Sequence, residues 1–198
     1  RGPVASLPWP DGTHPILAKL GLCPTIGLGN SSMILMRVRA ALRQRAIREG
    51  RDTRDLPLVR VLGDAGTVWP CLAAEPPADP QDGCRVYIGE EGTRADELAY
   101  EGHPWPAGFH LNELTATSSL PVLDALLPGA KRLRFTCPGI DGNPGGYPVS
   151  IEGAQVTYDL PPDLTLPDAI AINTRHLRDE GIERTEDDGT VIYTEKAR

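Results

Sequence analysis

The stretch from His14 to Asn30 limits the possible folds of this chain more than any other part of the sequence. It predicts a short apolar helix that ends at Gly21 and a buried strand over residues 24–28. The strand is apolar without alternation, which is typical of a parallel strand covered on both faces. Two parallel strands joined by a helix require a strand before that helix, and only the proline-punctuated segment 1–13 is available there. We therefore expect the chain to begin with the second half of a β-α-β unit, excised from something longer.

Residues 33–48 form the clearest predicted helix, because apolar side chains recur on one side of it and arginines on the other. Seven arginines lie in and just after this helix, at positions 37, 39, 43, 45, 48, 51 and 54. They have two interpretations: a solvated helix face, or a surface that contacts phosphate or a partner subunit.

The rest of the chain alternates short apolar runs with Gly- and Pro-rich turns. A hairpin is predicted where residues 56–62 and 67–72 flank Gly63-Asp64-Ala65-Gly66. A helix over 111–127 contains Pro121, which should kink it or divide it in two. Further strands are expected at 85–89, 132–136, 147–151, 154–159, 182–185 and 190–194, with a helix over 166–177. The predicted class is α/β to α+β: a remnant of a parallel Rossmann-like layer in residues 1–54, then a mixed or antiparallel substrate or assembly domain in 55–198.

Composition narrows the classes of partner. The net charge of −7 makes sequence-independent binding of nucleic acid unexpected, because that mode depends on clustered Lys and Arg. No apolar run approaches the roughly 18 residues of a membrane span. The four cysteines form no C-x-x-C pair and lack histidines at ligand spacing, so no metal site is expected. Without a signal peptide or a dense cysteine framework, we expect reduced thiols and a cytoplasmic protein.

The first candidate site is the turn Gly27-Leu28-Gly29-Asn30, where α/β proteins place ligands at the carboxyl end of a strand. The N-terminus of the following helix offers N–H groups to an anion. The turn does not complete the G-x-G-x-x-G fingerprint, because position 32 is serine. The alternative is a tight turn that simply needs small residues.

The order of short Pro-containing helix, strand, Gly-x-Gly and long helix over residues 10–48 resembles the later part of the nucleotide-binding domain of lactate and malate dehydrogenases. It is also similar to that region of the NAD-dependent family 4 glycosidases. In those families this turn borders the nicotinamide, and the chain then enters a mixed α+β substrate domain. The resemblance implies that Gly27, Gly29 and Asn30 border NAD(P), with the phosphate loop lying upstream of residue 10.

The second candidate site is the polar run 112–119, preceded by His110. Asn112, Thr115 and Ser119 have the i, i+3, i+7 spacing of one helical stripe and could bind a substrate, with His110 as acid or base. The alternative is helix capping, with hydroxyls that bond back to carbonyls.

The third candidate site is the loop 141–148, in which paired glycines allow a close approach and Tyr147 offers a hydroxyl as a second catalytic group. The alternative is a connection between strands that needs positive φ. His14 precedes a proline at a helix start, where a capping or surface role competes with catalysis.

Two functions from different classes follow. One is the substrate-domain portion of a bacterial NAD(P)-dependent oxidoreductase that acts on a small polar metabolite, with His110 and Tyr147 as catalytic residues. The other is a non-catalytic assembly subunit of a split complex, as a homo-oligomer or with a partner chain, because half a sheet leaves an unpaired edge.

Overall fold

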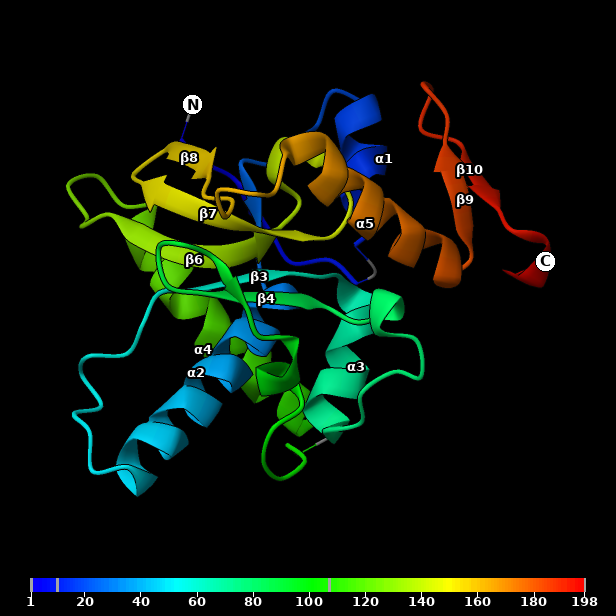
Figure 1. Cartoon of the computed structure of the whole chain (residues 1–198). Helices are drawn as coiled ribbons and strands as arrows, with labels where there is room; N and C mark the ends of the chain where they lie inside the picture. The colour runs from blue at the N-terminus through cyan, green and yellow to red at the C-terminus, as the bar shows by residue number, and fades with distance from the viewer. Residues whose placement is uncertain (1, 10, 107, 198) are drawn as a thin grey trace.

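A complete but very small β-α-β unit opens the structure, a computed structural model that describes residues 2–9, 11–106 and 108–197 (Figure 1). Strand β1 (Ala5–Ser6) pairs in parallel with β2 (Ile26–Gly27), and α1 (Thr13–Lys19) joins them. The expected strand is therefore present, supplied by the proline-punctuated segment itself. Prolines on both sides keep it two residues long, because proline cannot donate to a strand ladder. The expectation of a missing first strand is wrong.

Helix α2 (Ser31–Arg48) begins directly after β2. Gly29 and Asn30 both have positive φ, at 78° and 46°, and this pair of residues redirects the chain from strand to helix. Ile34, Leu35 and Val38 are fully buried on the inner face of the helix. The prediction of this helix is confirmed, and it starts two residues earlier than expected.

The arginines of this region divide between the protein interior and an exposed surface, to which Arg43, Arg51 and Arg54 belong. Arg37 is 1 % exposed, and its guanidinium donates to the backbone carbonyls of Ala99, Glu101 and His103. Arg45 and Arg48 form ion pairs with the carboxylate of Glu101. Arg37 therefore belongs to the core. Neither interpretation of the arginines, a solvated helix face or a surface that contacts phosphate or a partner, applies to it.

Two three-stranded antiparallel sheets form the middle of the molecule. The first has the order β3 (Val59–Leu62), β4 (Arg85–Ile88), β5 (Thr93–Arg94), and the second β6 (Leu133–Pro138), β7 (Gly146–Glu152), β8 (Gln155–Tyr158). They are joined by a single antiparallel bridge, in which Gly63 and Gly146 exchange both backbone hydrogen bonds. A Cβ atom on Gly146 would lie 1.9 Å from Ser31 Oγ, so only glycine fits there. The paired glycines of loop 141–148 thus serve a close approach between backbones.

One expected hairpin is instead a strand followed by a helix. After β3, helix α3 (Ala65–Ala73) replaces the predicted second strand. Asp64 caps it: Thr67 N donates to Asp64 Oδ1 and Asp64 N donates to Thr67 Oγ1, which is a reciprocal capping box. The apolar run Thr67–Leu72 suits either a buried strand or a buried helix, and the cap decides between them.

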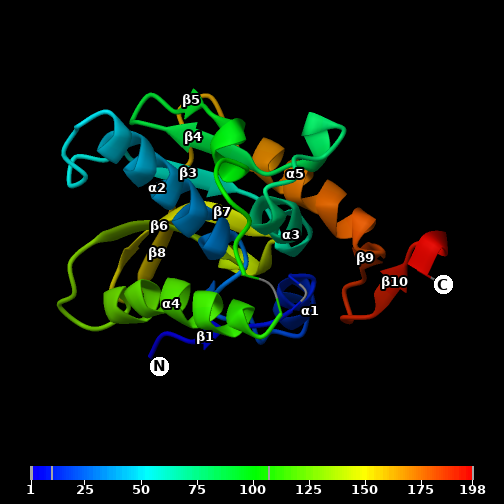
Figure 2. The ribbon, with the colours of Figure 1, turned by 90° about the horizontal axis from the view of Figure 1, so that it is seen from below.

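The remaining helices cover the sheets from two sides. In Figure 1, α2, α3 and α4 (His110–Ala125) lie below the strands, and α5 (Leu166–Asp179) lies to the right of β7 and β8 and above β3 and β4. Helix α4 continues through Pro121 without a break. The hairpin β9 (Ile182–Thr185) and β10 (Val191–Tyr193) projects at one end, as Figure 2 also shows, and confirms the predicted Asp-Asp-Gly hairpin. Short 3-10 turns occupy Pro80–Asp82, Asp96–Ala99, Ile140–Gly142 and Glu195–Ala197.

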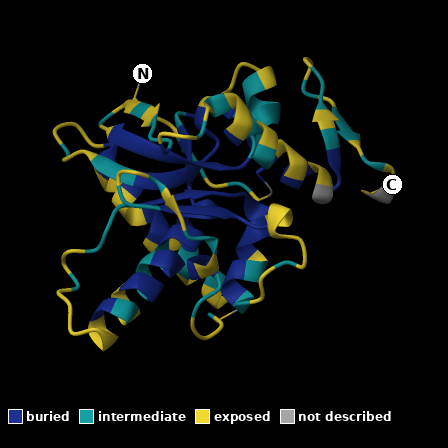
Figure 3. Ribbon diagram, viewed as in Figure 1, coloured by how far each residue is buried: buried dark blue, intermediate teal, exposed yellow. Residues whose placement is uncertain are grey.

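The core lies between these layers, as the dark strands and inner helix faces of Figure 3 show. One apolar cluster includes Ile26 and Val38 from residues 1–54 together with Val86, Phe135 and Ala169 from residues 55–198. The chain is mixed α/β, with small sheets that are parallel at the start and antiparallel afterwards. Within the described ranges, no helix combines the length and the hydropathy needed to cross a membrane.

Candidate functional site: the Asn30 pocket

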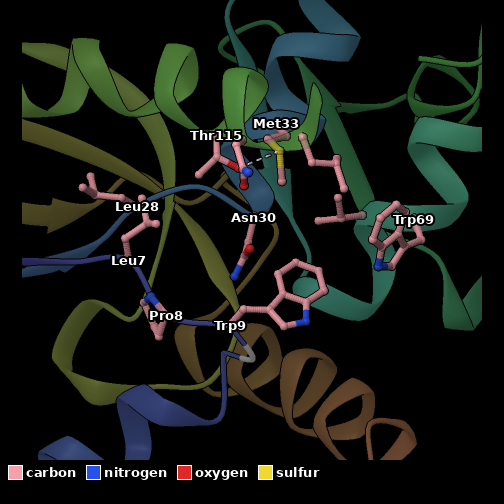
Figure 4. A pocket seen from close by; sticks show the side chains of 11 residues that line it. Leu7, Pro8, Trp9, Leu28, Asn30, Met33, Trp69 and Thr115 are labelled. Carbon is pink, nitrogen blue, oxygen red and sulfur yellow. Dashed lines mark hydrogen bonds between the residues drawn. The ribbon is translucent and has the colours of Figure 1, made fainter. Parts of the chain in front are cut away.

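A pocket of about 240 Å³ opens where the β2–α2 turn meets α3 and α4 (Figure 4). A cavity of roughly 150 Å³ already holds benzene, so this volume suits one substituted aromatic ring. We call it the Asn30 pocket. Its lining residues come from four segments far apart in the sequence: Leu7, Pro8, Trp9, Leu28, Asn30, Met33, Val68, Trp69, Leu111, Asn112 and Thr115.

The pocket has a buried apolar floor and an aromatic rim. Leu28, Met33 and Val68 are at most 7 % exposed, whereas Trp9 and Trp69 are 54 % and 44 % exposed. The two indoles meet edge to face, with ring centroids 6.3 Å apart and planes at 74°. Edge-to-face packing holds large flat surfaces in place at a low cost in side-chain entropy. The rim therefore presents two large aromatic surfaces beside the opening of the pocket.

Three polar side chains line the pocket, and Asn30 is the most buried of them at 4 % exposure. Figure 4 shows its amide between Trp9 and the pair formed by Thr115 and Met33. Asn30 Nδ2 donates to Asp11 Oδ1 at 2.5 Å, so the amide nitrogen is already engaged. Among the residues that the structure describes, the pocket lining contains no Lys, Arg, Asp or Glu. Its chemistry is that of a neutral, largely apolar site with a few hydrogen-bonding groups.

Asn30 also carries backbone strain. Its φ of 46° with ψ of −109° lies outside the left-handed helical region that asparagine tolerates. Such a conformation costs on the order of 1–3 kcal/mol and persists only where the surroundings enforce it. Gly29 beside it meets α4 closely, since an added Cβ would lie 2.9 Å from Thr115 Cγ2. The turn and α4 are thus held together at the pocket.

Buried acidic groups lie behind the pocket wall. Asp11 is 1 % exposed and accepts a second hydrogen bond, from Ala65 N to Oδ2 at 2.7 Å. Burial, reinforced by the nearby charge of Asp64, raises the pKa of Asp11 to about 7, against the opposing effect of its two hydrogen bonds. Burial and the charges of Asp64 and Asp11 raise the pKa of Glu180 to about 8. Asp11 therefore changes its protonation near neutral pH.

A second cavity, of about 400 Å³, lies on the other side of α3 and is lined by Asp64, Gly66, Thr67, Pro70, Pro77, Asp82, His176 and Glu180. His176 Nδ1 lies 3.5 Å from Asp64 Oδ1. Despite these acids, no group of three or more His, Cys, Asp or Glu among the described residues is placed to hold a metal ion. The four cysteines are free thiols.

Several of the candidate residues from two separate sequence motifs meet in the Asn30 pocket. Asn30 comes from the Gly-x-Gly turn, and Asn112 and Thr115 come from the polar run at the start of α4. Gly29 borders the pocket through its contact with Thr115. The structure thus brings together residues that are 82 or more positions apart in the chain, as the Thr115 Oγ1 to Met33 Sδ contact of 3.5 Å illustrates.

The other candidates lie elsewhere. His110 is on the surface, 3.5 Å from the carboxylate of Glu113. Ser119 is buried and donates to the carbonyl of Thr115, which is the capping-type alternative for this run. Tyr147 is fully buried and donates to the carbonyl of Pro144, and burial raises the pKa of its hydroxyl. These placements correct the expectation that all of them face one substrate.

Gly27 packs against the imidazole of His14 and is not among the residues that line the Asn30 pocket. A Cβ on Gly27 would lie 2.7 Å from His14 Nε2, and one on Gly139 would lie 2.2 Å from His14 Cδ2. The imidazole is fully buried, and burial lowers its pKa, which favours the neutral ring. His14 therefore has neither a capping nor a surface role.

Sequence reasoning missed Trp9, Trp69 and Asp11. Trp69 was assigned to a strand, and the Asp64-x-x-Thr67 spacing could have indicated the capped helix that carries it. Asp11 follows two prolines and a tryptophan with no motif around it. Only the fold brings its carboxylate behind Asn30.

Comparison of this chain with protein-family models, with curated proteins and with solved structures finds no match.

Proposed function

We propose that the Asn30 pocket binds the ring of a flat heteroaromatic amide, and that the chain acts as the substrate-domain portion of an NAD(P)-dependent oxidoreductase. The observation that carries the proposal is the combination of an aromatic rim with one strained, buried amide at the end of β2. Strained backbone conformations concentrate at ligand-binding and catalytic positions. The resemblance to dehydrogenases that the sequence of residues 10–48 suggests would put the same turn at the nicotinamide border.

The lining residues fit the nicotinamide end of such a cofactor. The indoles of Trp9 and Trp69 and the floor at Leu28 suit an apolar ring, and Asn30, Asn112 and Thr115 suit its carboxamide. Bound NAD(P) would supply hydride transfer, while these residues would orient the ring and exclude water from one face. None of the described residues that line the pocket offers a cationic side chain to the pyrophosphate. We therefore assign the ring alone to this pocket.

The test is a titration of the purified chain with nicotinamide, NAD⁺, NADP⁺ and ADP, followed by tryptophan fluorescence and calorimetry. Saturable quenching is expected with the three nicotinamide compounds and not with ADP. Trp69→Ala should weaken binding roughly tenfold, because stacking on one aromatic side chain contributes about 1–3 kcal/mol. Thr115→Val, which keeps the methyl group against Gly29, should weaken binding only a few-fold.

Trp105→Phe is the matched control. Trp105 lies outside the pocket, where its ring centroid is 5.7 Å from the guanidinium of Arg37. This variant should bind like the wild type, with one fluorophore fewer. Absence of saturable binding by every nicotinamide compound would overturn the proposal.

Assembly with a second copy of the chain is the other candidate function. Leu120 and Leu123 lie one turn apart on α4, and Leu127 follows just after the end of the helix; they are 64 %, 43 % and 56 % exposed. Exposed apolar stripes of this kind mark interaction surfaces. Light scattering should then give the mass of a dimer, and Leu120→Glu with Leu127→Glu should return it to a monomer. A monomeric wild type across micromolar concentrations would contradict this function.

A further inference from the structure

The side-chain amide of Asn30 has a hydrogen-bond donor, Nδ2, and an acceptor, Oδ1, and Asp11 binds only the donor. Asn30 Nδ2 donates to Asp11 Oδ1 at 2.5 Å. Among the described residues, no hydrogen bond to Asn30 Oδ1 is present, and the side chain lines the pocket. The orientation held by Asp11 therefore presents an acceptor to a ligand.

Asp11 can hold this orientation only as a carboxylate. Both of its oxygens accept, Oδ1 from Asn30 and Oδ2 from Ala65 N. A protonated carboxyl has one O–H donor that needs an acceptor. Because Ala65 N is a fixed backbone donor at the start of α3, a protonated Asp11 keeps its carbonyl oxygen best at Oδ2 and carries the proton on Oδ1. The carbonyl oxygen of Asn30 can accept that proton's hydrogen bond once the amide turns over.

We propose that Asp11 is a positioning residue that sets the hydrogen-bonding polarity of the Asn30 pocket, an inference that rests on the proposed function. Ionised Asp11 holds Asn30 Nδ2, and Oδ1 of Asn30 then accepts from a ligand. Protonated Asp11 donates to Oδ1, and the NH₂ group of Asn30 then donates to a ligand. The pocket thus prefers a ring carboxamide in the first state and a ring carboxylate in the second.

The groups around Asp11 set the pH range in which its carboxyl gains or loses a proton. Asp64 at the start of α3, Glu180 after α5 and Tyr147 on β7 interact electrostatically with Asp11. His14 lies on α1, which Asp11 precedes, and His176 on α5 lies 3.5 Å from Asp64. Burial raises the pKa of Asp11 to about 7, and the charge of Asp64 adds to this. Glu180, itself raised to a pKa of about 8 by burial, interacts electrostatically with Asp11 and Asp64. The two states of Asp11 therefore exchange between pH 6 and pH 8.

The experiment compares nicotinamide with nicotinate, which differ only in the ring substituent. Between pH 8 and pH 6, nicotinate should bind roughly tenfold more tightly, because a hydrogen bond to a charged group is gained as the carboxylate opposite is neutralised. Nicotinamide, which carries both a donor and an acceptor, should change by less than roughly threefold. Equal pH dependence for both ligands would overturn the inference.

Asp11→Asn tests the orientation directly. The backbone N–H of Ala65 must keep an acceptor, so the new side chain directs its carbonyl there and its NH₂ toward Asn30. The variant should therefore behave as the protonated state at every pH, with tight nicotinate binding retained at pH 8. Asp124→Asn is the control, because Asp124 is an exposed carboxylate on α4, and it should keep the wild-type pH profile. An Asp11→Asn variant with the wild-type profile would contradict the inference.

A measurement without ligand separates this inference from the proposed function. The carboxyl carbon of Asp11 and the side-chain NH₂ signals of Asn30 are followed by NMR from pH 5 to pH 9. Coupled titration of the two groups is expected, with the Asn30 signals of Asp11→Asn independent of pH. Coupled titration without binding of either ligand would sink the proposed function and retain the positioning role. Titration of Asp11 with unchanged Asn30 signals would sink the positioning role alone.

Discussion

At the scale of single residues, close approaches explain positions that the sequence marks only by composition. Gly146 lies between Ser31 on α2 and the backbone of Gly63, where an added Cβ would meet Ser31 Oγ at 1.9 Å and the Gly63 carbonyl at 2.9 Å. Gly145 has positive φ, and an added Cβ there would lie 2.6 Å from Asn173 Cγ. The Gly-Gly pair was correctly predicted to allow a close approach, but the partner is the protein itself.

We predict that Gly146→Ala destabilises the protein. The methyl group cannot fit without moving α2 away from the β3–β7 bridge, and overpacking of a filled core costs typically about 1–3 kcal/mol. The urea midpoint of unfolding measures the loss. Gly2→Ala is the control, since nothing lies within 4 Å of a Cβ there and its midpoint should not change. A wild-type midpoint for Gly146→Ala would show that the two sheets are not joined in this way.

At the scale of secondary-structure elements, the sequence predicted an element correctly where capping or turn residues and the periodicity of apolar residues indicated the same element. The helices at 33–48 and 166–177 and the hairpin at 182–194 were predicted because periodicity, capping residues and turn residues all indicated the same element. The prediction of a hairpin over 56–72 is wrong, because a continuous run of apolar residues has no periodicity that distinguishes a buried strand from a buried helix. The capping box of Asp64 and Thr67 decides that case in favour of α3.

Thr67→Val should therefore destabilise the start of α3. Thr67 is 2 % exposed, accepts from Asp64 N and donates to the Asp64 carbonyl, and valine can do neither. A buried donor left without a partner costs about 1–3 kcal/mol. Chemical unfolding followed by circular dichroism should show this loss, while Thr117→Val on the exposed side of α4 should stay within about 0.5 kcal/mol of the wild type. Equal effects of the two variants would contradict the role of the cap.

At the scale of the whole molecule, buried carboxyls from three segments make stability depend on pH. Asp11 precedes α1, Asp64 caps α3 and Glu180 follows α5. Burial raises the pKa of Asp11 to about 7 and that of Glu180 to about 8, whereas in the unfolded chain both titrate near about 4. The folded state therefore binds more protons than the unfolded state between these values. These two carboxyls therefore make the free energy of unfolding decrease as the pH rises through this window, and only His14, whose pKa burial lowers, acts in the opposite direction among the shifts named here.

We predict a falling urea midpoint from pH 5 to pH 8, with a change in the free energy of unfolding on the order of a few kcal/mol, most of it from the fully buried Asp11. Asp11→Asn should remove most of the slope, and Glu180→Gln should remove part of it and lower the pKa of Asp11. Asp124→Asn should follow the wild-type profile. A midpoint that is constant or rises between pH 5 and pH 8 would contradict the burial of these carboxyls.

Local chemistry determined the elements of this protein, and tertiary packing determined its candidate site. Capping residues, positive-φ glycines and apolar periods act over a few neighbours, so the turn at Asn30 and the polar start of α4 were recognisable in the sequence as separate candidates. Their meeting in one pocket depends on how α4 packs against the β2–α2 turn, which no local pattern encodes. The same packing buries Tyr147 and Ser119, brings Trp9 against Trp69, and places Asp11 behind Asn30. Burial and proximity in space, which raise the pKa of a carboxyl and orient an amide, are properties of the folded chain alone.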